Sequence, residues 1–204
     1  MQRVMQRWVA GLAIAGLTVT LAALLSCGSA QERRPDVIFV PTPQPVVERM
    51  LELAKVTKND VVYDLGCGDG RIVVTAAKKY GCRAVGVDID PQRVKESLDN
   101  VKKNGVENLV TIVQKDIFTL DLAKGIDDNI PPPTVVTLYL LTSLNEKLVP
   151  QLQKMKPGTR VVSHSFEIPG YRPDKVEQVN ADGFNRTIYL YTIPLKPKAN
   201  DDDD

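Results

Sequence analysis

The sequence has few of the residues from which metal sites and disulfide frameworks are built. Its 204 residues include one histidine, His164, and three cysteines, Cys27, Cys67 and Cys82. A single histidine excludes a multi-histidine metal site, and no cysteine pair has the spacing of zinc ligands. We therefore expect no metal. A Cys67–Cys82 disulfide would tie down a glycine-rich loop, so we expect two unpaired, mostly buried thiols.

A large excess of either charge is also absent. Lys and Arg total 26 and Asp and Glu total 25, which gives a formal net charge of +1. A chain so close to neutral has no electrostatic footprint for duplex nucleic acid, although a local patch stays open. We expect no nucleic-acid partner. The length and a hydrophobic fraction of 43% suit one domain with appendages.

The one long apolar run lies near the N-terminus. Residues 8–25 are uncharged and mostly apolar, follow a basic start, and lead to Cys27 among small residues. We interpret residues 1–29 as a signal peptide or membrane anchor. The ending resembles a bacterial lipoprotein signal, whose cleavage would leave Cys27 as a lipid-modified N-terminus. The alternative is an uncleaved anchor, because residues 8–25 just reach spanning length.

The charges around this leader do not decide which face of the membrane carries the domain. Arginines precede the apolar run, but Arg33, Arg34 and Arg49 follow it closely, so the positive-inside signal is nearly balanced. We expect membrane association through residues 1–29 on a face that the sequence leaves open. At the other end, residues 196–204 are expected to be a disordered acidic tail.

Residues 30–195, between these ends, alternate short β-branched apolar runs with helical segments. This alternation predicts βαβ units, and hence an α/β, Rossmann-like, doubly wound seven-stranded sheet that is mostly parallel. No helix separates the last two strands, which predicts an antiparallel edge hairpin with its turn near Asp182. The expected strands are 61–65, 84–88, 109–113, 134–141, 160–165, 176–179 and 187–193, and the expected helices are 45–54, 71–80, 91–104 and 144–155.

The strongest motif is a glycine loop that begins at Asp64 and reads Asp-Leu-Gly-Cys-Gly-Asp-Gly, between a predicted strand and a predicted helix. Gly66, Gly68 and Gly70 let the backbone turn sharply and come close to a ligand. A dinucleotide-binding loop needs its third glycine at position 71, where this sequence has Arg71. An acid at the strand end would also oppose a pyrophosphate, whereas it suits an ammonium group.

This combination resembles motif I of class I S-adenosylmethionine-dependent methyltransferases, and the resemblance covers most of the chain after the leader. In that family the strand-end acid, here Asp64, holds the amino-acid part of the cofactor, and the glycine backbone packs beside it. The acid that ends the second strand binds the ribose hydroxyls and maps to Asp88, with Asp90 as a less favoured alternative. Asp116 and Ile117, after the third strand, match the residues beside the adenine. The resemblance implies S-adenosyl-L-methionine as the cofactor.

Each of these acids also has a purely structural interpretation. Asp64 could form a turn, Asp88 and Asp90 could cap a helix, and Asp116 could be a solvated loop residue. They nevertheless occur in order, each at the C-terminal end of a predicted strand, where sheets of this kind bind ligands. We therefore favour the binding roles.

The methyl acceptor leaves weaker marks in the sequence, because methyl transfer depends on alignment and exclusion of water more than on a strong base. The Asn/Asp-Pro-Pro-Tyr motif of adenine-N6 and glutamine-N5 methyltransferases is absent at the fourth strand, which argues against those acceptors. Tyr139 is a candidate catalytic residue there, with simple packing in the strand as the alternative. His164, at the end of the fifth strand, is a candidate proton relay or a structural histidine.

Three segments narrow the resemblance, namely Phe-Val-Pro-Thr-Pro at 39–43, the run 64–72 and Leu-Tyr-Leu-Leu at 138–141. Together they resemble the small, membrane-anchored protein-lysine methyltransferases that modify the c-ring protein of ATP synthase, distant relatives of the Dot1 histone methyltransferases. The resemblance implies a protein lysine as methyl acceptor. It also places Thr42 over the cofactor, with the flanking prolines stiffening a lid.

One rival hypothesis comes from another functional class. A catalytically idle, membrane-tethered domain could bind an adenosine-type ligand or a partner protein. The export-like leader favours this rival, because S-adenosylmethionine is not expected outside the cytoplasm. A dehydrogenase is disfavoured by Arg71. We predict an S-adenosylmethionine-dependent methyltransferase that acts on a protein lysine or another small nucleophile.

Overall fold

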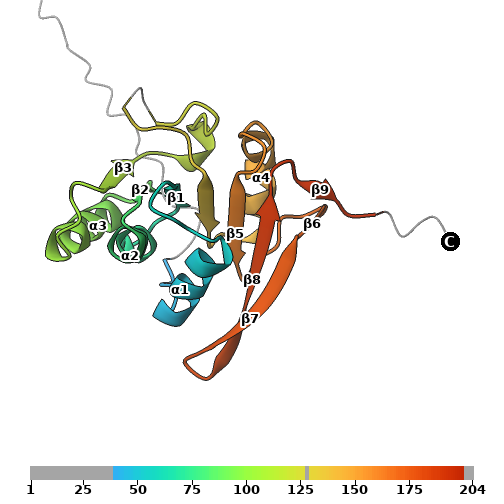
Figure 1. The fold of residues 1–204 in the computed structure, drawn as a ribbon, viewed down its shortest axis with the longest axis horizontal. Coiled ribbons are helices and arrows are strands. Elements are labelled where there is room, and N and C mark those ends of the chain that lie inside the picture. The colour runs from blue at the N-terminus through green and yellow to red at the C-terminus, as the bar shows by residue number, and fades with distance from the viewer. Residues whose placement is uncertain (1–38, 127–128, 200–204) are drawn as a thin grey trace, which may run out of the picture. The chain divides into compact units, whose positions relative to one another are not determined.

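Seven strands form one sheet in the computed structural model, in the order β3-β2-β1-β4-β5-β8-β7 (Figure 1). The structure describes residues 39–126 and 129–199, so the predicted leader at 1–29 lies outside the described residues. Strands β1 to β5 run parallel, while β8 pairs antiparallel with β5 and with β7. The predicted Rossmann-like sheet with an antiparallel edge hairpin is confirmed.

Helices and strands alternate up to the fifth strand, as the sequence pattern indicates. Asp90 caps α3 by accepting a hydrogen bond from the Gln92 backbone N–H, and Pro91 occupies the first turn, where its missing N–H has no cost. The elements are α1 (Gln44–Leu53), β1 (Val61–Leu65), α2 (Arg71–Tyr80), β2 (Arg83–Asp88), α3 (Pro91–Lys103), β3 (Val110–Gln114), the 3-10 helix η1 (Ile117–Thr119), β4 (Val135–Leu138), α4 (Thr142–Leu152), β5 (Arg160–His164), β6 (Tyr171–Arg172), β7 (Lys175–Ala181), β8 (Phe184–Thr192) and β9 (Lys196–Pro197).

Strand β4 is shorter than the predicted 134–141. It ends at Leu138, which pairs with Leu65 at the end of β1 and with Ser163 near the end of β5. Beyond that point the chain leaves the sheet and enters α4 at Thr142. Tyr139 therefore lies just past the C-terminal edge of the sheet, where a side chain can face a ligand.

The polar tail begins later than the sequence predicts. Within the expected disordered stretch 196–204, Lys196 and Pro197 form β9, which pairs antiparallel with β6. Lys196 also donates a hydrogen bond to Asp174 at 2.5 Å. A pair of two-residue strands has no hydrophobic pattern, so nothing in the sequence indicates it. Residues 200–204 lie outside the described part of the chain.

Two apolar cores fill the two faces of the sheet. On one face α1, α2 and α3 pack through buried side chains that include Met50, Ile72 and Val101. On the other face α4 and η1 pack through side chains such as Leu148 and Ile117. This layering leaves the C-terminal ends of the parallel strands as the edge at which loops from both faces meet.

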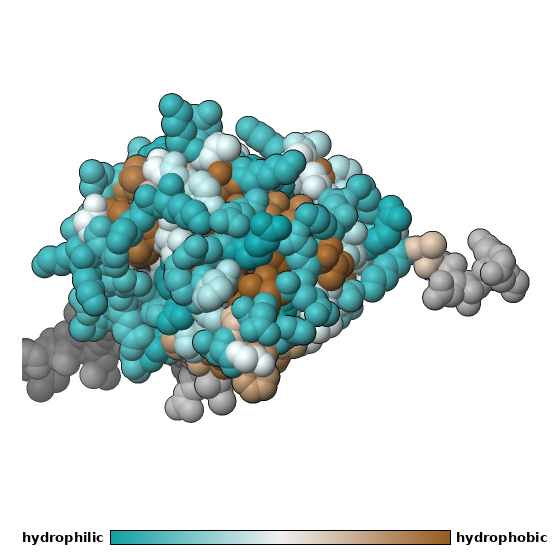
Figure 2. Space-filling model, turned by 60° about the horizontal axis from the view of Figure 1, so that its bottom comes forward, coloured by the Kyte–Doolittle hydropathy of each residue, from teal (hydrophilic) through white to brown (hydrophobic). Residues whose placement is uncertain are grey.

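The surface of the described domain is mostly polar. Figure 2 shows a largely hydrophilic face on which apolar side chains form small, separate groups. The exposed large hydrophobic residues are scattered in sequence: Val40, Leu98, Leu141, Val176 and Phe184. No helix within residues 39–126 and 129–199 is both long and apolar enough to cross a membrane.

Candidate active site

A pocket opens at the C-terminal ends of β1, β2, β3 and β4, and most of the predicted site residues meet there. β1 and β4 are neighbours in the sheet although α2, β2, α3 and β3 separate them in sequence, which makes this the topological switch point where such sheets bind ligands. Gly68, Gly70 and His164 lie outside the pocket lining. The predicted residues that line it are Thr42, Asp64, Gly66, Asp88, Asp116, Ile117 and Tyr139.

The glycine loop adopts the left-handed backbone that its composition predicts. Gly66, Gly68 and Gly70 have φ angles of 83°, 56° and 75°. The steric reason differs from the one expected, because a Cβ at Gly68 would lie 2.0 Å from the ring of Phe39. A Cβ at Gly70 would lie 3.0 Å from the Ser97 hydroxyl. Both glycines thus admit other parts of the protein against the loop, rather than only a ligand.

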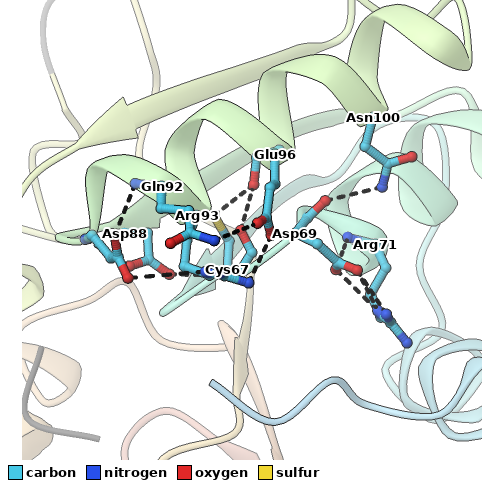
Figure 3. A network of polar contacts seen from close by, with 11 residues as sticks. Cys67, Asp69, Arg71, Asp88, Gln92, Arg93, Glu96 and Asn100 are labelled. Carbon is cyan, nitrogen blue, oxygen red and sulfur yellow. Dashed lines mark hydrogen bonds and ion pairs between the residues drawn. The ribbon is translucent and has the colours of Figure 1, made fainter. Parts of the chain in front are cut away.

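Helix α3 and strand β2 hold the loop in place through its backbone groups (Figure 3). The Ser97 hydroxyl donates to the Gly68 carbonyl at 2.7 Å, and the Asn100 amide donates to the Asp69 carbonyl at 3.0 Å. The Gly68 N–H donates to Asp88 Oδ2 at 2.8 Å. Because the loop is braced from behind, its remaining surface is preorganised to face the pocket.

Asp64 is a buried acid at the floor of the pocket. Its side chain is only 3% exposed, and Thr137 Oγ1 donates to its Oδ1 at 2.7 Å. Burial, with Asp88 and Asp69 adding repulsion, raises the pKa of Asp64 to about 7. Within the described residues no Lys, Arg or His pairs with it. A cation placed in the pocket would stabilise its carboxylate form, so this acid suits an ammonium group.

Asp88 and Asp90 divide the roles that the sequence left open between them. Asp90 is the helix cap, since its Oδ1 accepts from the Gln92 N–H at 2.8 Å. Asp88 does not cap the helix; besides Gly68, its carboxylate accepts the Asp90 N–H at 3.0 Å. Burial raises the pKa of Asp88, whose carboxyl group lines the pocket. Asp88 is therefore the better placed of the two for a ligand.

Asp116 and Ile117 form the wall beyond β3. Asp116 Oδ1 accepts the Phe118 N–H at 2.9 Å and caps η1, so Asp116 is a structured residue rather than a solvated loop acid. Ile117 is 9% exposed and, with Phe118, gives this wall an apolar surface. An acid next to flat apolar side chains is the combination that an adenine ring and its amine require.

His164 lies behind Tyr139 rather than in the pocket lining. The Tyr139 ring centroid lies 4.0 Å from that of His164 and 6.2 Å from that of Phe166. His164 is fully buried, and its Nδ1 lies 3.3 Å from Thr42 Oγ1, while its Nε2 has no partner among the described residues. Burial, aided by Arg186, lowers the pKa of His164 to about 4. A neutral, enclosed imidazole suits a structural role better than a proton relay.

Sequence reasoning assigns no role to four residues at the pocket: Phe39, Asp69, Arg71 and Arg93. Arg71 donates from Nη1 to the Thr42 carbonyl at 2.8 Å, and Arg93 lies 4.8 Å from the Phe39 ring centroid. Phe39 belongs to a recognised motif, but its contact with the glycine loop joins distant parts of the chain. We call residues 39–43 the strap, because Phe39, Val40 and Thr42 all line the pocket.

The cysteines follow the prediction. Cys67 and Cys82 are free and buried, and burial raises the pKa of both thiols. No cluster of His, Cys, Asp and Glu within the described residues could hold a metal ion. The site chemistry therefore consists of carboxylates, glycine backbone and aromatic rings.

Comparisons with known proteins agree with this geometry. Residues 64–175 match the family described as ANTKMT methyltransferase domain. A protein-lysine N-methyltransferase of Saccharolobus islandicus (strain REY15A) is 52% identical over 161 residues, covering 78% of this chain and 95% of that protein. A lysine N-methyltransferase of Xenopus laevis, named for the C-type subunit of ATP synthase, is 26% identical over 200 residues, covering 96% and 82%.

Solved structures give the same fold with a related ligand. The crystal structure of an RNA methyltransferase from Salinibacter ruber in complex with S-adenosyl-L-homocysteine has a TM-score of 0.67 and 48% sequence identity. The match covers 81% of this chain and 99% of that one. With the matching family, the relatives and this neighbour in agreement, the chain belongs to the ANTKMT methyltransferase domain family and is an S-adenosylmethionine-dependent methyltransferase.

Proposed function

We propose that this enzyme transfers the methyl group to the side-chain amine of a protein lysine. The observation that carries the proposal is the 52% identity to a protein-lysine N-methyltransferase, 95% of whose length is matched. The relatives from Xenopus laevis and Caenorhabditis elegans, both named as lysine N-methyltransferases of an ATP synthase component, support the same acceptor at lower identity. The site adds an aromatic wall at the point where the acceptor would enter.

The cofactor roles follow from the pocket. We assign the cofactor's ammonium to Asp64 and its ribose hydroxyls to Asp88, because a carboxylate can accept from two hydroxyls at once. The adenine lies against Asp116 and Ile117 in this proposal. The backbone at Gly66, Gly68 and Gly70 passes beside the amino-acid part and the ribose, and Thr42 covers the bound molecule.

The protein's own contribution to the reaction is to orient the amine and exclude water. When bound, the cofactor supplies an electrophilic methyl group, so that a sulfur–carbon bond breaks as a nitrogen–carbon bond forms. The lysine must first lose a proton, and a dry aromatic surface at Tyr139 and Phe166 lowers the pKa of an entering ammonium. The neutral His164 supports Tyr139 from behind and contributes no charge to the site.

The test uses S-adenosylmethionine labelled in its methyl group, incubated with the protein and with a membrane-protein extract. We expect label in protein, at the amine of lysine after complete digestion, and none with the Asp64→Asn variant. An Asp182→Asn variant, altered in the exposed hairpin turn, should label protein as the wild type does. Label that is confined to other side chains would contradict the lysine assignment.

RNA is the second candidate acceptor, because the 48% identical neighbour is described as an RNA methyltransferase. An aromatic wall also suits a stacked base. Total RNA added to the same assay separates the two acceptors. Label that is lost on ribonuclease treatment and absent from protein would replace the lysine proposal with an RNA one.

We further propose that residues 1–29 attach the enzyme to a membrane, with Cys27 as the lipid-modified residue. The apolar run 8–25 and the small residues around Cys27 support this proposal. Cys27→Ser should block lipid attachment and leave an unprocessed precursor, as mass spectrometry of the N-terminus would detect. Wild-type protein that retains an unmodified Met1 or Met5 would point to a simple anchor instead.

A further inference from the structure

The strap, residues 39–43, contacts three separate elements around the pocket. Phe39 packs against the glycine loop at Gly68 and beneath the guanidinium of Arg93 on α3. The Thr42 hydroxyl lies 3.3 Å from His164 on β5, and its carbonyl accepts from Arg71 on α2. The strap therefore forms one wall of the cofactor pocket, while its neighbours form the others.

Arg71 is the polar link between this wall and the cofactor loop. Its guanidinium donates to Asp69 through Nε at 3.0 Å and through Nη2 at 2.6 Å, which leaves Nη1 to reach the Thr42 carbonyl at 2.8 Å. Figure 3 shows the Asp69 carboxylate beside the Arg71 guanidinium, on the side away from Asp88. The forked contact fixes the guanidinium plane, so that one N–H always points at the strap.

The chain position of Arg71 makes this link mechanically direct. Arg71 is the first residue of α2 and follows Gly70, the last glycine of the loop. Any movement of the loop on binding a ligand therefore moves Arg71, and through it Thr42. The hydrogen bonds from Ser97 and Asn100 hold the loop but do not reach the strap.

We propose that Arg71 is a positioning residue that holds the strap closed over the cofactor and couples strap closure to cofactor binding. Asp69 aims Arg71 at the strap. Because coupling is reciprocal, a ligand on the loop stabilises the closed strap, and a closed strap slows release of the ligand. The coupling to ligand rests on the proposed function, in which Thr42 covers the cofactor; the contact between Arg71 and the strap does not.

The experiment compares Arg71→Met with the wild type in two measurements on the full chain. The first is the rate at which chymotrypsin cuts after Phe39 without cofactor, followed by mass spectrometry, because cleavage requires the strap to open. The second is calorimetric binding of S-adenosylhomocysteine, with the dissociation rate measured separately. We expect faster cleavage and roughly tenfold weaker binding, the scale of one lost charge-assisted hydrogen bond.

Two further variants define the control and the graded response. Arg49→Met removes an exposed arginine of α1 that pairs with Glu177 and Glu52 outside the pocket, and should match the wild type in both measurements. Arg71→Lys should fall between, because one ammonium cannot replace the fork that joins Asp69 to Thr42. If Arg71→Met fails to fold by circular dichroism, Asp69→Asn takes its place and should give the same direction of change.

Unchanged cleavage after Phe39 in Arg71→Met would overturn the proposal, whatever the ligand does. Faster cleavage with unchanged affinity and unchanged dissociation rate would overturn the coupling to cofactor. If the wild-type protein bound no S-adenosylhomocysteine, the proposed function would fail, and the cleavage measurement alone would still decide whether Arg71 holds the strap.

Discussion

Replacing Asp64 by asparagine should stabilise the cofactor-free protein at alkaline pH while it removes cofactor binding. In the folded protein burial raises the pKa of Asp64 to about 7, from an ordinary value of 3.8. The folded state therefore keeps a proton that the unfolded state has lost, and the stability falls as pH rises through this window. The full difference corresponds to roughly 4 kcal/mol at about 1.36 kcal/mol per pH unit.

Asparagine cannot ionise, so it avoids this loss at pH 8. Its carbonyl can still accept from the Thr137 hydroxyl, which now lies 2.7 Å from Asp64 Oδ1. Its amide N–H groups are buried at the pocket floor, which costs about 1–3 kcal/mol. We therefore expect Asp64→Asn to raise the free energy of unfolding by about 2 kcal/mol at pH 8, and to lower it or leave it unchanged at pH 4.

Urea denaturation without cofactor at pH 4, 6 and 8 measures this directly. Other titrating groups contribute equally to both proteins, so the difference between wild type and variant isolates Asp64. Asp182→Asn, the same change in an exposed turn, should track the wild type at each pH. A variant less stable than the wild type at pH 8, or a difference that does not change with pH, would refute the reasoning.

The remaining predictions concern the other residues of the site. Gly68→Val should abolish S-adenosylhomocysteine binding and keep the fold, because its Cβ would fall 2.0 Å from the Phe39 ring; normal binding by calorimetry would contradict the assigned loop geometry. Asp88→Ala should weaken binding by roughly 1–3 kcal/mol through the loss of a charged acceptor, and an unchanged affinity would leave Asp88 only the bracing of Gly68. In rate measurements from pH 6 to 9, activity should rise as the acceptor amine loses its proton, with no inflection from His164, whose pKa is about 4. An inflection near pH 6.5 that disappears in His164→Gln would show that the imidazole titrates during turnover.

The parts of the site that lie close together in sequence could be predicted from it. The run from Asp64 to Gly70 contains its own turn chemistry, and Asp88 follows a β-branched run, so their positions at strand ends depend only on local patterns. The parallel sheet follows from the same alternation. These features need no knowledge of how distant segments pack.

The parts that depend on packing between distant segments could not. That Phe39 packs at Gly68, that Arg71 bonds to Thr42, and that His164 is enclosed behind Tyr139 are each set by where three or four elements meet. The candidate relay role for His164 rests on its place at a strand end, but the degree of burial decides its protonation. Burial is a property of the whole fold, not of a strand end.

The order of strands in the sheet has a consequence for biosynthesis. β8 lies between β5 and β7, although it is the last of the seven strands to leave the ribosome. Until residues 184–192 are made, β5 presents an unpaired edge and β7 has no partner, which leaves the nascent chain open to edge-to-edge aggregation. A chain interrupted before Thr192 therefore lacks an interior strand rather than a peripheral one, and native pairing in this half of the sheet is necessarily post-translational or nearly so.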